Sequence, residues 1–199
     1  MNYLAHAWLA RHHDDAILGA ILGDFVRGQA ALADWPPMVR DEILLHRQID
    51  GYTDAHPAVA AARALFGDGL RRYAGIVLDV YFDHRLARDW SRWEAQPLDT
   101  FTSRVYRILA GYRARLPERL KAIAPLMARH DWLGSYRARG SVDNVVRGIS
   151  TRLSRNGERL LACLPVLAAN EAAVDAAFEM FFPALIEASH AMRATQQQL

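Results

Sequence analysis

Apolar residues along this chain recur every three or four positions, which is the spacing of one face of an α-helix. The spacing predicts helices over residues 4–9, 14–26, 36–49, 57–67, 70–93, 98–116, 117–129, 142–153 and 168–192. Alternating β-branched runs are missing, and no repeat, linker or shift in composition marks a domain boundary. The sequence therefore predicts an all-α protein, with residues 1–199 forming one helical-bundle domain.

The composition, 52% hydrophobic and 23% charged, is that of a globular protein. No run approaches the roughly 18 apolar residues that span a bilayer, so no membrane span is expected. The first residues lack the positively charged and apolar segments of a signal peptide. Cys163 is the only cysteine and has no disulfide partner within the chain. Together these features predict a cytoplasmic protein.

The basic residues are unusual, because Lys121 is the only lysine among 24 Lys and Arg residues. A GC-rich genome would explain this, since it favours arginine codons. A surface that binds phosphate or an acidic partner would also explain it, because guanidinium grips oxyanions through two parallel hydrogen bonds.

Several acidic residues lie on helix faces that should be apolar. Asp24 lies one turn after Ala20 and Ile21, where a bare carboxylate would cost several kcal/mol. It must be paired, with Arg27 as the nearest partner, or protonated, or bound to a metal.

Asp79 and Asp83 lie one turn apart, where like charges repel. A divalent cation would turn this repulsion into coordination. An exposed face, with Arg85 and Arg88 as partners, is the alternative.

Two further pairs share this one-turn spacing: His46 with Asp50, and Asn2 with His6. A single helical histidine is more often a packed or surface residue than a ligand. Four Asp- or His-bearing helices within the first 84 residues favour a metal site, because helix bundles build such sites by projecting pairs of ligands inward. No phosphate-binding loop, zinc-type cysteine spacing or serine elbow is present.

Four segments together resemble the bacterial acyl carrier protein phosphodiesterases. They are residues 1–6 (MNYLAH), 22–28 (LGDFVRG), 46–54 (HRQIDGYTD) and 78–84 (LDVYFDH). The resemblance continues to Asn144 and Arg152 in the predicted 142–153 helix. It implies an all-helical, manganese-dependent, non-standard member of the HD phosphatase and phosphodiesterase group. The implied reaction releases 4′-phosphopantetheine from a serine of holo acyl carrier protein.

The HD group usually uses a His-Asp doublet as ligands, whereas the long helix here carries the reversed doublet Asp83-His84. We therefore assign the site from helix geometry. The expected ligands of Mn²⁺, or of another divalent metal, are His6, Asp24, Asp79 and Asp83. The expected catalytic residues are Asp24, His46, Asp50 and His84, with His84 protonating the serine leaving group. The expected substrate-binding residues are Arg27, Arg47, Asn144 and Arg152.

Acyl carrier proteins are acidic, so the resemblance implies that arginines form the docking surface for holo acyl carrier protein. The candidates are Arg104, Arg107, Arg113, Arg137 and Arg139. The residues also leave two other functions open: an HD-type enzyme acting on nucleotides, and a non-catalytic helical adaptor for an acidic protein. No nucleic-acid partner is expected, because the arginines are scattered and no nucleic-acid-binding motif is present.

Overall fold

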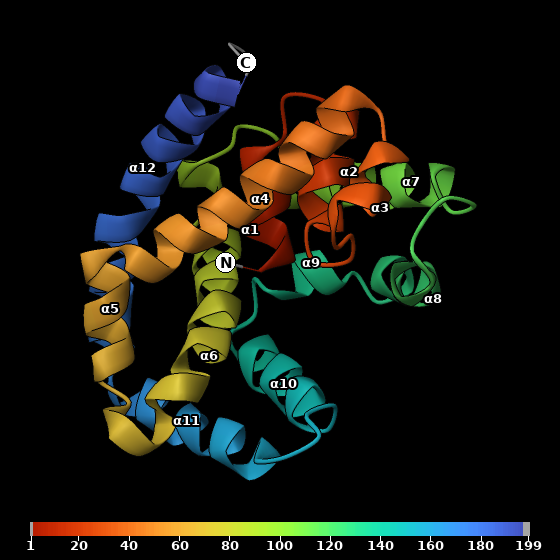
Figure 1. Ribbon diagram of the computed structural model, residues 1–199. Coiled ribbons are helices and arrows are strands. Elements are labelled where there is room, and N and C mark those ends of the chain that lie inside the picture. Colours follow the sequence, from red (N-terminus) through yellow and green to blue (C-terminus); the bar gives the residue numbers. More distant parts are fainter. Residues whose placement is uncertain (1, 197–199) are drawn as a thin grey trace.

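The computed structural model describes residues 2–196, and every regular element in this range is a helix (Figure 1). The first half of the chain forms α1 (Tyr3–Leu9), α2 (Asp14–Leu22), α3 (Gln29–Ala33), α4 (Pro37–Ala55), α5 (Pro57–Ala64) and α6 (Gly67–Arg88). A 3-10 turn at Trp90–Arg92 follows. The second half forms α7 (Leu98–Gly111), α8 (Glu118–Arg129), α9 (Trp132–Ser135), α10 (Arg139–Ser150), α11 (Gly157–Ala169) and α12 (Glu171–Gln196). The predicted all-α class is confirmed.

Local sequence explains where several helices begin. Pro37 and Pro57 occupy the first positions of α4 and α5, where a missing N–H costs nothing because that group has no partner within the helix. The His13 side chain accepts a hydrogen bond from the Asp15 N–H and so caps α2. Asp14 and Asp15 in the first turn of α2 also interact favourably with the positive end of the helix dipole.

Three helices were not predicted: α3, α9 and α11. The α11 segment GERLLACLPVLAA buries residues at helical spacing, but beyond its first turn the exposed positions are alanine and proline, so no polar face marks it as an amphipathic helix. The predicted 168–192 helix is α12, which begins at Glu171 after a break at Asn170. Pro125, Pro165 and Pro183 lie inside helices rather than at breaks, and all three are exposed.

The break at Asn170 separates two helices that are relevant to the question of a membrane span. In the part of the chain that the structure describes, no single helix is both long and apolar enough to cross a membrane. The α11–α12 pair, bent by 88°, meets that test by length and composition alone.

The core surrounds α1, whose residues from Leu4 to Leu9 are all buried. This helix packs against α2 and α6, and α2 packs closely against α4. Gly19 allows that close approach, because a Cβ at this position would lie 2.5 Å from the carbonyl oxygen of Val39. One hydrophobic cluster extends from α1 to α12 and includes the stacked rings of Phe178 and Phe182.

Asp83 of α6 holds the first turn of α1 in place. Its fully buried carboxylate accepts hydrogen bonds from the N–H groups of Leu4, at 2.8 Å, and Ala5, at 3.1 Å. These N–H groups have no partner within a helix, and Asn2 does not cap them with its side chain. Burial raises the pKa of Asp83 to about 7, although both hydrogen bonds oppose this rise. Asp83 therefore caps α1 from another helix.

We expect Asp83→Ala to lower the free energy of unfolding. The substitution leaves two buried N–H groups without a partner, at a cost of about 1–3 kcal/mol for each. Urea denaturation in the presence of a chelator measures this loss separately from metal binding. Asp54→Ala is the control, because its ion pair with Arg63 is exposed and contributes at most about 1 kcal/mol. Equal stability of the two variants would contradict the capping role.

Candidate metal centre

Two histidines from different helices share one carboxylate. His6 of α1 and His46 of α4 stack with ring centroids 3.7 Å apart. Their Nε2 atoms lie 3.1 Å and 3.2 Å from the two carboxylate oxygens of Asp50. Within residues 2–196, these three side chains are the one group whose ligand atoms all lie within 4.8 Å of one another. A single cation can be reached by all three.

The orientation of His46 is set by the backbone of α2. The Nδ1 atom of His46 lies 2.7 Å from the carbonyl oxygen of Ala20 and donates a hydrogen bond to it. The Nε2 atom then points toward Asp50, and toward Asp24 at 3.6 Å. Histidines that bind metals use this arrangement, in which a carbonyl fixes one nitrogen and leaves the other for the metal.

The protonation states differ between the two histidines. Burial would lower the pKa of His46, but its contacts with Asp24 and Asp50 raise it to about 9. Burial and the neighbouring His46 lower the pKa of His6 to about 4, although Asp50 opposes this. The cluster therefore holds one proton on His46 at neutral pH. A metal ion bound at Nε2 would replace that proton.

The ring of His46 fits against α2 only because residue 23 is glycine. A Cβ on Gly23 would lie 2.2 Å from Cγ of His46, which is far inside contact distance. The backbone of Gly23 is in the ordinary right-handed helical region. Glycine is therefore required here because the imidazole needs the space, and not because the backbone conformation is unusual.

A cleft of about 280 Å³ opens beside this cluster. Its wall contains four carboxylates, from Asp24, Asp50, Asp54 and Asp79, so it attracts cations. Burial opposes ionisation of Asp24 and Asp50, but hydrogen bonds from His46, and for Asp50 also from His6, lower the pKa of both. Asn2, Thr53, Ile76, Val80 and Ile149 complete the lining.

The structure brings most of the predicted metal and catalytic residues to this one place. His6, Asp24, His46, Asp50 and Asp79 come from α1, the end of α2, α4 and α6. Two predicted residues lie elsewhere. The carboxylate oxygens of Asp83 are taken by the backbone of α1, and Nδ1 of His84 bonds to the carbonyl oxygen of Tyr136 at 2.7 Å. Neither residue lines the cleft.

The four predicted substrate-binding residues are dispersed. Arg47 donates a hydrogen bond to the carbonyl oxygen of Val26, at 2.9 Å, and so braces the loop after α2. Arg27 is exposed on that loop. Arg152 follows cleft residue Ile149 by one turn, whereas Asn144 lines a different cavity.

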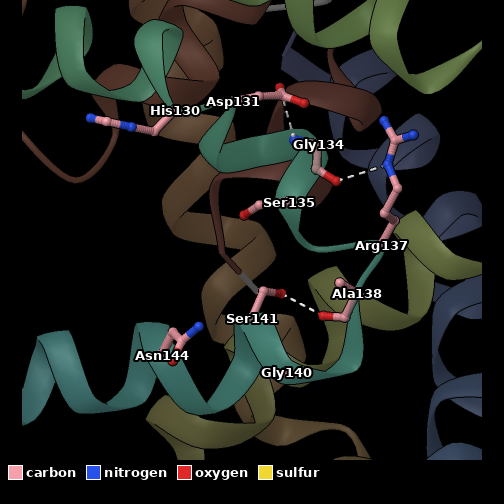
Figure 2. Close-up of a pocket in the computed structure, with 9 residues that line it drawn as sticks. All are labelled: His130, Asp131, Gly134, Ser135, Arg137, Ala138, Gly140, Ser141 and Asn144. Atoms are coloured by element: carbon pink, nitrogen blue, oxygen red, sulfur yellow. Dashed lines mark hydrogen bonds between the residues drawn. The ribbon is translucent and has the colours of Figure 1, made fainter.

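That second cavity, of about 490 Å³, lies between α9 and α10 (Figure 2). Its charged groups already have partners. Asp131 accepts hydrogen bonds from the Gly134 N–H and the Tyr106 hydroxyl, and Arg137 binds the Gly134 carbonyl and Asp99. The rest of the lining is His130, Ser135, Ala138, Gly140, Ser141 and Asn144. The smaller cleft, and not this cavity, adjoins the group that could hold a metal ion.

Sequence reasoning missed the residues that support the cluster. Gly23 and the Ala20 carbonyl orient His46, and Tyr136 accepts a hydrogen bond from the Asn2 amide at 2.7 Å. Gly23 lies in one of the four family-like segments, which was the available signal. The Ala20 contact is made by a backbone atom, so no side-chain pattern could reveal it.

The fold and the cluster define a class: an all-helical protein with a His and Asp site suited to a divalent metal. The family model described as "Acyl carrier protein phosphodiesterase" matches residues 1–185. The chain therefore belongs to the acyl carrier protein phosphodiesterase family.

Proteins of that name from Serratia proteamaculans (strain 568) and Salmonella agona (strain SL483) are each 37% identical over 156 residues. These matches cover 78% of this chain and 80% of each relative. No solved structure matches the chain.

We expect Gly23→Ala to weaken manganese binding by about 10- to 100-fold, as losses of groups that orient metal ligands do. The added methyl group would push the His46 imidazole out of its position. Isothermal titration calorimetry measures the affinity. Gly51→Ala is the matched control, because Gly51 lies on α4 with open space around it. Equal affinities in the two variants would show that His46 is not a ligand.

Proposed function

We propose that this protein is a metal-dependent phosphodiesterase that removes 4′-phosphopantetheine from holo acyl carrier protein, giving apo acyl carrier protein. The observation that carries the proposal is the cluster of His6, His46 and Asp50 beside an acidic cleft, within a chain of this family. The enzyme class follows from the family. The substrate follows from the name that the relatives bear.

We assign the metal to His6, His46 and Asp50, with Asp24 and Asp79 available from the cleft wall. Imidazole and carboxylate donors together suit manganese, iron or zinc. Mn²⁺ is our choice because the family resemblance implies it. The exposed side of the cleft leaves room for water and substrate, as a catalytic metal site requires.

When bound, the metal supplies an acidified water molecule and polarises the phosphoryl oxygen. Asp24 is the best-placed residue to orient and deprotonate the attacking water, because its side chain is 48% exposed in the cleft and approaches His46. Asp50 holds both histidines in position. His84 lies outside the cleft, so we assign it no proton-transfer step.

The docking surface for the acidic carrier is assigned to Arg107 and Arg113, which are exposed on α7 and just after it. The other three predicted arginines already have carboxylate partners. Arg104 pairs with Asp14, Arg137 with Asp99, and Arg139 with both Asp143 and Glu171.

Metal removal tests the reaction directly. We expect purified protein with Mn²⁺ to remove the phosphopantetheine arm from holo acyl carrier protein, and a chelator to stop this. Intact mass spectrometry follows the carrier. An unchanged mass with a folded, manganese-loaded protein would contradict the carrier substrate and favour a nucleotide. Absence of bound metal would favour the adaptor.

Substitution of the cleft carboxylates tests the site. Asp24→Asn and Asp79→Asn should each abolish detectable turnover while circular dichroism shows unchanged helix content. Asp68→Asn is the control, because Asp68 is exposed in the first turn of the helix that carries Asp79. Full activity of either cleft variant would remove that residue from the site.

Ionic strength tests the docking surface. We expect the KM for holo acyl carrier protein to rise with salt, because exposed charges are screened within about 10 Å at 0.1 M. The double variant Arg107→Ala/Arg113→Ala should show a higher KM and a weaker salt dependence. Arg71→Ala, an exposed arginine of α6, serves as the control. A salt-insensitive KM in the unmodified enzyme would contradict electrostatic docking.

A further inference from the structure

Aromatic and cationic side chains lie beside the cleft, next to Asp24. Tyr3 of α1 follows cleft residue Asn2 in sequence, and Phe25 follows cleft residue Asp24. The two rings stack with centroids 6.1 Å apart and an interplanar angle of 19°. The guanidinium carbon of Arg119, from α8, lies 5.8 Å from the Phe25 ring centroid. A helix far along the chain thus brings a positive charge to the edge of the cleft.

A second arginine, Arg152, lies in the turn directly after α10. The backbone N–H of Arg152 bonds to the carbonyl of cleft residue Ile149 at 2.9 Å. Burial and the charge of Asp24 raise the pKa of Tyr3 to about 12, whereas Arg119 and Arg152 both act to lower it. The charges of Asp24, Arg119 and Arg152 thus all act on the Tyr3 phenol. The Tyr3 hydroxyl keeps its proton at neutral pH and can donate a hydrogen bond.

The charges in the cleft make such groups necessary for a phosphate substrate. Four carboxylates line the cleft and would repel a phosphodiester. A bound divalent metal offsets only part of that charge, so positive groups are needed on the side of the phosphate that faces away from the metal. Arg47 is exposed as well, but it directs one guanidinium nitrogen to the Val26 carbonyl of the loop after α2. Arg119 and Arg152 are both exposed, which leaves their guanidinium groups accessible to a ligand.

We propose that Tyr3, Arg119 and Arg152 form an anion-binding rim that holds the non-bridging oxygens of a phosphate ester against the His6, His46 and Asp50 cluster. Guanidinium groups suit this role because they bind phosphate through paired, charge-assisted hydrogen bonds. The Tyr3 hydroxyl adds a neutral donor from the α1 side. The rim deepens the proposed function, on which its choice of a phosphate ester rests, by naming two residues that the sequence did not indicate, Tyr3 and Arg119.

The test uses inorganic phosphate, so it does not depend on turnover. With enzyme in excess over Mn²⁺, paramagnetic broadening of the ³¹P signal reports phosphate held near the metal. We expect Arg119→Gln and Arg152→Gln to weaken phosphate binding by about tenfold each, and Tyr3→Phe by about threefold. Manganese affinity, measured by calorimetry, should change less than twofold. Arg129→Gln, near the other end of α8, should match the unmodified protein.

Failure of the rim and failure of the proposed function give different results. Unchanged phosphate binding in both arginine variants, or no phosphate binding by the unmodified manganese-loaded protein, overturns the rim. Phosphate binding that depends on the rim, without any turnover of holo acyl carrier protein, overturns the carrier substrate and leaves the rim standing. Arg119→Lys keeps the charge and should recover part of the lost affinity. If Arg119→Lys binds phosphate as weakly as Arg119→Gln does, the positive charge at this position is not what binds phosphate.

Discussion

The pair of hydrogen bonds from Asp83 to the start of α1 is the contact on which the site depends. A helix as short as Tyr3–Leu9 is not stable by itself, because too few hydrogen bonds repay its nucleation. Burial in the core and a cap supplied by α6 hold it instead. His6 lies within one turn of this cap, so fixing the first turn also fixes the imidazole. The buried carboxylate is thus a structural support for a ligand on another helix.

The second constraint is the close approach of α2 and α4. Gly19 and Gly23 lie one turn apart on α2 and remove the Cβ atoms that would hold α4 away. The gap admits the His46 ring, and the Ala20 carbonyl between these glycines orients it. The two histidines, although stacked, then have different affinities for a proton. His46 faces two carboxylates, and His6 is fully buried beside a cation. A metal bound at His46 would therefore displace one proton, and His6, which is already neutral, would lose none.

Helical spacing was enough to predict most of the side chains that the fold gathers at the cleft and its cluster. The one-turn pair His46 and Asp50 is in the site, as are Asp24, Asp79 and His6. The same spacing could not separate Asp79 from Asp83. Both lie on one face of α6, but the first turn of α1 packs against Asp83, and Asp79 lies in the cleft. Packing across the core determines which aspartate α1 meets, and the helical spacing of the sequence does not predict this packing.

Two further features were not predicted for the same reason, because they depend on contacts between helices. The helix α11 packs against α6, α10 and α12, but most of its exposed positions are alanine or proline, so its outward face carried little polar signal. Arg119 belongs to a helix that begins far from the first 84 residues in sequence, and only the folded chain brings it to Phe25. The all-helical class depends on local spacing and was predictable, whereas the unpredicted residues depend on contacts between distant helices.

The positions of paired and exposed charged residues determine where a cation and where an anion would be attracted. Arginines that lie next to carboxylates, such as Arg85 with Asp175 and Glu179, join α6 to α12 and contribute to the fold. Asp24 and Asp50 contact the histidines, and the four carboxylates that line the cleft together favour a cation. Exposed arginines outside the cleft produce the opposite field. An anionic ester is therefore attracted to the edge of the cleft and repelled by its carboxylates until a metal is bound. Under the proposed function, this order would let one small site take up a cation first and a phosphate ester afterwards.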